Sequence, residues 1–224
     1  MCSAYENASA IGRYANQKIL QFQKQYLSKG RGASKGRATL ARLRRMGTDG
    51  CGSWLIAGDE LFTDLPDFAL DPREEKRALN AVTAIFRLYA QHQQSESEPM
   101  ALCKQSEEAK SAAPRRSFGW SCWRAGFSAD KHGQDKSPGI KRRLASLESA
   151  VDFDGIETQL RGLMSIVKSE GVPVDYYLLA QDLYLLQIPS CHDDVFLRWS
   201  RDYYRPYVGG ESQDELADSR QLAS

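Results

Sequence analysis

Apolar and aromatic side chains recur every three or four residues in several parts of this chain. One such run extends from Ile11 to Tyr26. The most regular run consists of Ile156, Leu160, Leu163, Met164 and Val167. This spacing places the apolar side chains on one face of an α-helix, which can then pack on a core. No stretch shows the alternation typical of strands, so the pattern predicts an all-α protein.

Residues that favour helix ends flank these runs. The sequence "DPRE" (Asp71–Glu74) predicts a helix start, with Asp71 as the N-cap and proline in the first turn. Asp175 is placed to cap "YYLLAQDLYLL", which is apolar almost all round and is therefore expected to be a buried helix. Further ends are expected at Gly30, Gly47, Gly171, Pro173 and Pro189, with Asp193 or Asp194 capping the last helix and a second helix running from about Gly36 to Met46.

The helical pattern is interrupted once over a long distance. Residues 95–137 are rich in Ser, Ala, Lys and Glu and lack sustained periodicity, which is typical of a linker or insertion. We therefore predict two helical bundles joined by this segment. Their expected bounds are residues 1–93 for the N-terminal bundle, 94–137 for a flexible linker, 138–208 for the C-terminal bundle and 209–224 for a disordered polar tail.

Charged residues are segregated in the N-terminal half, although the whole chain is nearly neutral, with 30 Lys and Arg against 29 Asp and Glu. Between Lys29 and Arg45 there are seven basic residues and no acid, whereas between Asp59 and Glu75 there are seven acids and a single arginine. Such segregation indicates a surface for a polyanion. The alternative is a solvated surface on which the two segments attract each other.

The C-terminal stretch "VFLRWSRDYYRPY" (residues 195–207) carries three arginines and five aromatic residues. In a helix, Arg198, Arg201 and Arg205 leave from one stripe, while Trp199 and Tyr203 form a second stripe that is expected to be core. A row of guanidinium groups suits phosphate. Nearby Asp194 and Asp202 allow the alternative of a salt-bridged, solvated face.

The motifs in the sequence do not favour an enzyme. The five cysteines are scattered without a CxxC pair, and there is no signal-like or membrane-spanning apolar stretch, which favours a reduced, soluble, cytosolic protein without membrane contact. "CHDD" (Cys191–Asp194) has too few histidines elsewhere to complete a metal site, and "GRGASKGR" (Gly30–Arg37) lacks the spacing of a phosphate loop. No catalytic residue, metal or cofactor is expected.

Three motifs, taken together, resemble one family. They are "RATLARLRR" at Arg37–Arg45, "GVPVDYYLLAQDL" at Gly171–Leu183 and "RWSRDYY" at Arg198–Tyr204. In this order and approximate spacing they resemble the CasB family, the small subunit of the type I-E CRISPR surveillance complex Cascade. The resemblance covers the N-terminal helices to about Trp54 and the region from Gly139 to Tyr204.

The resemblance implies a specific role. Members of this family are all-helical and non-catalytic, and they occur as two copies beside other Cascade protein subunits, the guide RNA and the target DNA with its displaced strand. Their basic surfaces would help to keep the R-loop open, in which base pairing reads sequence and protein charge favours the open state. The alternative is a helical scaffold that bridges proteins without touching nucleic acid.

The resemblance and the charge pattern together nominate a set of nucleic-acid contacts. On the motifs these are Arg42, Arg44, Arg45 and Arg201. On spacing and charge, Lys35, Arg37, Arg198 and Arg205 join them. The basic stretch in "GIKRRL" adds Lys141, Arg142 and Arg143, for which a simply solvated helix start is the alternative. Assigned to the core are Trp199, Tyr203, Tyr176, Leu179 and Leu183.

The segment "RRSFGWSCWRAGF" (Arg115–Phe127) interleaves aromatic residues with arginines inside the predicted linker. Docking on a neighbouring subunit is the expected role. Stacking on exposed bases and folding back over a bundle are the alternatives.

Overall fold

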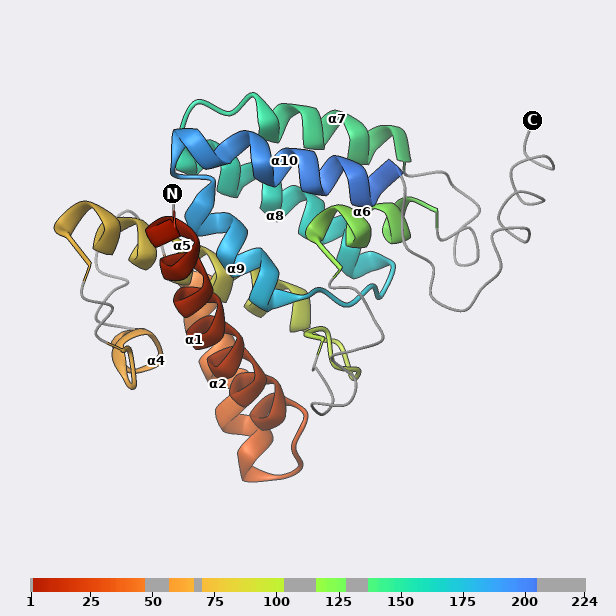
Figure 1. The fold of residues 1–224 in the computed structure, drawn as a ribbon. Helices are drawn as coiled ribbons and strands as arrows, with labels where there is room; N and C mark the ends of the chain where they lie inside the picture. Colours follow the sequence, from red (N-terminus) through yellow and green to blue (C-terminus); the bar gives the residue numbers. More distant parts are fainter. Residues whose placement is uncertain (1, 47–56, 67–69, 103–115, 128–136, 205–224) are drawn as a thin grey trace, which may run out of the picture.

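The computed structural model describes residues 2–46, 57–66, 70–102, 116–127 and 137–204. These residues form α-helices and no strand, so the all-α prediction is confirmed (Figure 1). None of the described helices is long and apolar enough to cross a membrane. The helices are α1 (Cys2–Tyr26), α2 (Arg31–Arg45), α4 (Gly58–Phe62), α5 (Pro72–Gln93), α6 (Phe118–Gly126), α7 (Ser137–Glu148), α8 (Phe153–Ser169), α9 (Tyr176–Leu185) and α10 (Pro189–Tyr204).

Two of the predicted N-caps are confirmed by their hydrogen bonds. The Asp71 carboxylate accepts from the backbone N–H groups of Arg73 (2.8 Å) and Glu74 (2.9 Å) at the start of α5. Asp175 accepts from the N–H of Leu178 (3.1 Å) at the start of α9. Both caps satisfy N–H groups that have no partner within the helix.

The predicted start of the last helix is wrong. α10 begins at Pro189, ahead of Asp193 and Asp194. Proline fits there because the first helical N–H needs no intrahelical partner and the proline ring fixes a helical φ. Asp194 instead accepts a hydrogen bond from the Tyr5 hydroxyl on α1 (2.7 Å), and this bond raises the pKa of Tyr5 to about 12. The second helix also begins before Gly36, at Arg31.

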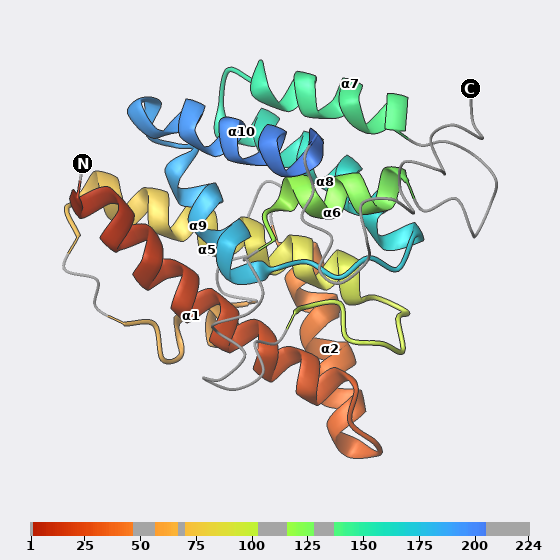
Figure 2. The same ribbon diagram turned by 45° about the vertical axis from the view of Figure 1, so that its right-hand side comes forward.

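The helices share one hydrophobic core, and α9 lies at its centre. α9 packs mainly on α1 and α5, and α8 also packs on α5 (Figures 1 and 2). Helices from the two halves of the chain are therefore joined by common apolar contacts, while the predicted bundle bounds at residues 93 and 138 stay a prediction. The side chains assigned to the core are at most 3% exposed, which confirms the assignment for Tyr176, Leu179, Leu183, Trp199 and Tyr203.

Part of the segment predicted as a flexible linker is helical. α6 packs on α10, and Trp120 and Trp123 are only 8% and 5% exposed. The segment thus folds back over the C-terminal helices. The expectation that its rings dock on a neighbouring subunit is wrong for Trp120 and Trp123, whereas Phe127 is 47% exposed and its docking stays a prediction. Gly119 makes the packing possible, because a Cβ there would lie 2.7 Å from the Cα of Trp199. A nine-residue helix with two glycines gives little periodic signal.

The segment between α5 and residue 102 is also anchored. Gln23 on α1 binds the backbone of Ala101 twice, accepting from its N–H (2.8 Å) and donating to its carbonyl (3.2 Å). Ala101 forms an isolated bridge with Val174 just before α9. These bonds fix one end of the predicted linker against both halves of the chain.

Candidate nucleic-acid interface

Helix α2 places its basic residues outward because its other face is held close to α1. Leu40 and Leu43 are fully buried. Gly36 faces the backbone of Tyr26 so closely that a Cβ would lie 2.6 Å from the Tyr26 nitrogen. Four of the predicted contact residues point to the outer side of α2, where Arg44 is half-buried and the others exposed: Lys35, Arg37, Arg44 and Arg45.

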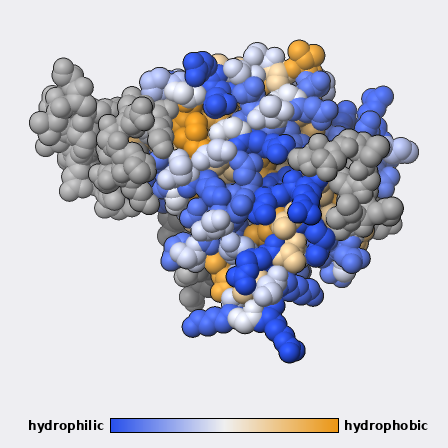
Figure 3. All heavy atoms as spheres, turned by 180° about the vertical axis from the view of Figure 1, so that it is seen from behind, coloured by the Kyte–Doolittle hydropathy of each residue, from blue (hydrophilic) through white to orange (hydrophobic). Residues whose placement is uncertain are grey.

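Hydrophilic side chains project from the end of the molecule at which α1 and α2 join. Figure 3 shows this end at the bottom of the view from behind, with hydrophilic residues covering most of the face above it. The exposed Lys35 and Arg37, near the start of α2, add positive charge at this end, which favours a polyanion.

Arg42, although it lies in the same motif, is engaged inside the fold. Its guanidinium binds Glu60 of α4, with a distance of 2.9 Å from Nε to Oε1, and also the Thr39 hydroxyl (3.2 Å). Glu60 is only 7% exposed, so Arg42 serves as its counter-ion. The alternative of mutual attraction between the basic and acidic segments is therefore realised at this residue.

Arg198 is also the partner of a buried acid. Its guanidinium binds Asp182 of α9, which is fully buried and also accepts from the Trp199 indole N–H (2.6 Å). Burial raises the pKa of Asp182 to about 6, and the charge of Arg198 opposes that rise. The alternative in which Arg198 pairs with Asp194 on its own helix is not realised, because its partner is Asp182 of α9.

Of the two remaining arginines in the C-terminal stripe, the structure describes only Arg201. Arg201 has a side chain that is 65% exposed and lies beside Asp202 (3.0 Å). An exposed pair of this kind contributes little stability and leaves the guanidinium accessible. Arg205 lies outside the described residues. Within the described residues, the three-arginine stripe thus supplies one exposed guanidinium, that of Arg201.

Helix α7 presents the basic residues of "GIKRRL" on its first turns, and all three are exposed. The Lys141 ammonium lies 5.7 Å from the centre of the Tyr204 ring. The Arg143 guanidinium lies against Gly162 of α8, because a Cβ on Gly162 would be 2.6 Å from Nη1. Gly162 therefore makes room for Arg143 to reach across α8.

A hollow of about 360 Å³ opens where α2, α5 and α8 meet. Arg44 of α2 and Arg161 of α8 line it, and Gly162, which Arg143 contacts, forms part of its wall. Among the described residues, Arg44, Arg143 and Arg161 have no acid within ion-pair distance. We call these three residues the junction arginines.

The base of the hollow is a buried ion pair. Arg87 of α5 binds Glu157 of α8 and donates to the carbonyl of Met46 (2.8 Å), just after α2. Burial raises the pKa of Glu157, while Arg87 opposes this by favouring the carboxylate. Glu157 forms its ion pair with Arg87, and the charge of Arg161 also favours its carboxylate from beyond ion-pair distance.

Lys168 lies near the hollow. Burial is the main cause that lowers its pKa; the charge of Glu96 opposes this shift and the charge of Arg44 adds to it. Gln91 positions α8 by donating to the carbonyl of Arg161 (3.0 Å) and to the Ser165 hydroxyl (2.8 Å). Guanidinium groups that line one hollow are suited to phosphate oxygens.

Sequence reasoning missed Arg161. It stands alone in the apolar run of α8, with no neighbouring basic residue within three positions on either side. The only available signal was its place on the polar side of that helix. Only the packing of α5 against α2 and α8, and of α7 against α8, places Arg161 near Arg44 and Arg143.

The described residues contain no group of three or more His, Cys, Asp and Glu side chains placed to hold a metal ion. Cys191 is buried, and His192 lies 3.4 Å from Asp193 on the exposed side of α10.

Comparisons with known proteins agree with this architecture. The family model of CRISPR-associated protein Cse2 matches residues 39–204, which include all three junction arginines. The crystal structure of CasB from Thermobifida fusca has 25% sequence identity and a TM-score of 0.66, and the match covers 87% of this chain and 98% of that chain. Among curated proteins none matches the chain. As its motifs predicted, the chain belongs to the Cse2 (CasB) family, the small subunit of the type I-E CRISPR complex Cascade.

Proposed function

We propose that this Cascade subunit is non-catalytic and binds the nucleic-acid backbone through the junction arginines. One observation carries the proposal. Arg44 and Arg161 come from two helices and line one hollow, Arg143 from a third helix contacts Gly162 in its wall, and none of the three has an ion-pair partner among the described residues. Exposed neighbours would extend the surface along α2 and α7: Lys35, Arg37, Arg45, Lys141 and Arg142.

The physical role of such a surface is to favour the open R-loop. Exchange of a DNA duplex for a guide RNA–target DNA duplex is nearly balanced in free energy, so modest backbone contacts decide its direction. Guanidinium groups on phosphates release counterions and do not read sequence. The partners in this proposal are the other Cascade proteins, the guide RNA and the target DNA with its displaced strand, and two copies of the subunit are present.

Two of the arginines predicted from the sequence have a different role in this proposal. Arg42 and Arg198 neutralise Glu60 and Asp182, so their loss would act on folding. Arg201 remains an accessible contact on α10. Substitution of Arg42 or Arg198 is therefore expected to lower stability, whereas substitution of an accessible arginine on the same helices is expected to weaken nucleic-acid binding.

The test is charge reversal in the assembled complex. The variant Arg44→Glu/Arg161→Glu is compared with Arg13→Glu/Arg124→Glu, which reverses two exposed charges on α1 and α6. We expect both variants to assemble normally, and only the junction variant to shorten the lifetime of the R-loop, measured by re-annealing of the displaced strand. Loss of assembly in the junction variant would favour the scaffold role. R-loop lifetimes equal to those of the control would overturn the proposal.

A further inference from the structure

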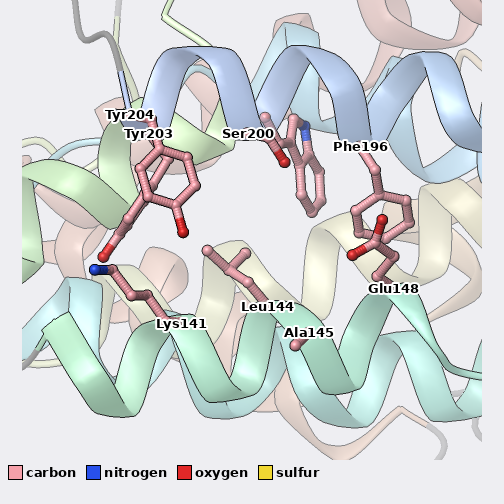
Figure 4. A pocket seen from close by; sticks show the side chains of 9 residues that line it. Lys141, Leu144, Ala145, Glu148, Phe196, Ser200, Tyr203 and Tyr204 are labelled. Atoms are coloured by element: carbon pink, nitrogen blue, oxygen red, sulfur yellow. The ribbon is translucent and has the colours of Figure 1, made fainter.

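A second binding feature lies away from the hollow, between α7 and α10. The two helices face each other across a groove of about 130 Å³, in which Lys141 and Leu144 oppose Phe196, Trp199 and Tyr203 (Figure 4). Aromatic side chains therefore form most of the α10 side.

The aromatic floor of the groove is held rigidly. The Trp199 indole N–H donates to Asp182 (2.6 Å), and the Tyr203 hydroxyl shares a hydrogen bond with the Ser137 hydroxyl (2.9 Å). Both rings are nearly buried. A floor whose side chains are fixed by hydrogen bonds is preorganised for a ligand.

At one end of the groove an aromatic ring and a cation lie together in solvent. Tyr204 is 63% exposed and packs edge-on against Tyr203, with ring centres 5.1 Å apart. The Lys141 ammonium lies 5.7 Å from the centre of the Tyr204 ring. An exposed ring beside a cation offers a stacking surface next to a phosphate contact, the combination found in single-strand binders.

At the other end stands the carboxylate of Glu148, as Figure 4 shows. Glu148 follows Lys141 by two helical turns, a separation of about 10 Å along α7. The groove thus presents a cation, aromatic rings and a hydrogen-bond acceptor in sequence. A nucleotide carries matching groups in the same order: a phosphate, a flat ring and, on every DNA base but thymine, an amino group at the base edge.

We propose that this groove binds one unstacked nucleotide of a single DNA strand and prefers bases that carry an amino group. The phosphate contacts Lys141, the exposed Tyr204 ring packs on the nucleotide at that end, the base enters the groove between α7 and α10, and Glu148 accepts from the amino group at the other end. Thymine presents a carbonyl at that position, which a carboxylate repels. The proposal rests on the proposed nucleic-acid-binding function and adds a base preference to it.

The test uses fluorescence anisotropy of the purified protein with labelled oligo(dC) and oligo(dT) of equal length at low salt. We expect wild type to bind oligo(dC) about fivefold more tightly than oligo(dT). Glu148→Gln should reduce that ratio, and Tyr204→Ala should weaken both affinities by roughly tenfold. Leu197→Ala removes another exposed side chain of α10, 71% exposed, and should change neither affinity.

Two failures can be told apart. If wild type binds both oligonucleotides equally and Tyr204→Ala has no effect, while Arg44→Glu/Arg161→Glu abolishes binding, the groove holds no base and the backbone-binding function stands. The same result is expected if the groove binds a segment of a partner protein instead of a base. If wild type binds neither oligonucleotide, the proposed function and the inference are both overturned.

Discussion

Replacing Arg198 with alanine removes the counter-ion of a carboxylate that has no contact with water. Asp182 is fully buried, and in the variant it would retain one donor, the Trp199 indole N–H at 2.6 Å. The Arg198 side chain is 29% exposed, so the change opens little space in the core. The perturbation is therefore mainly electrostatic.

The magnitude follows from the loss of one partner of a buried ion pair, which costs about 3–5 kcal/mol. Because Arg198 itself reaches solvent, we expect the lower end, about 3 kcal/mol at neutral pH. Loss of the guanidinium raises the pKa of Asp182 above its value of about 6. A raised pKa favours the protonated, neutral acid, so the destabilisation is largest above that pKa and shrinks as the pH falls through it.

The assay is urea unfolding at neutral pH, followed by tryptophan fluorescence and far-ultraviolet circular dichroism. Arg201→Ala is the matched control, because Arg201 lies one turn further along α10 and is 65% exposed. We expect the control to lose less than about 0.5 kcal/mol. If Arg198→Ala is as stable as the wild type and its unfolding depends on urea in the same way, the reasoning is refuted. Arg198 would then again be a candidate for nucleic-acid contact.

Three further predictions concern other parts of the fold. Gly119→Ala should separate α6 from α10, since the new Cβ would meet the Trp199 backbone; faster proteolysis within α6 and a red-shifted tryptophan emission would show it. Burial lowers the pKa of His92 from 6.5 to about 3, so its stability contribution is present above pH 6.5 and is lost as the pH falls. His92→Leu should therefore lose about 2 kcal/mol less than wild type between pH 7 and pH 5, measured by urea unfolding. Arg42→Ala should cost about 2–3 kcal/mol in the same assay by leaving Glu60 without its counter-ion, whereas an unchanged midpoint would contradict the internal pairing.

The sequence predicted those features of the fold that depend on neighbouring residues. The run from Ile156 to Val167 is buried on α8 as its spacing indicated, because helical periodicity maps directly onto one face. Asp71 and Asp175 cap their helices because the capping bond spans only two or three residues.

Contacts that depend on how helices cross were not predicted. Arg198 was compared only with acids on its own helix, whereas its partner Asp182 lies on α9, at a position that looked like part of an apolar helix. Arg161 gave no charge cluster in the sequence and joins Arg44 only through the packing of α8 beside α2 and α5. Charge patterns therefore located the basic helices, while tertiary packing divided their arginines into buried counter-ions and accessible contacts.

The central claim is that the junction arginines contact phosphates, and the salt dependence of target-DNA binding tests it most directly. The assembled complex would be measured with wild-type subunit and with Arg44→Ala/Arg143→Ala/Arg161→Ala, as the slope of log Kd against log salt concentration. Each lost phosphate contact lowers the steepness of this slope by about 0.7–0.9. We predict a decrease of about 2 or more for the triple variant. Parallel lines for the two complexes would contradict the account.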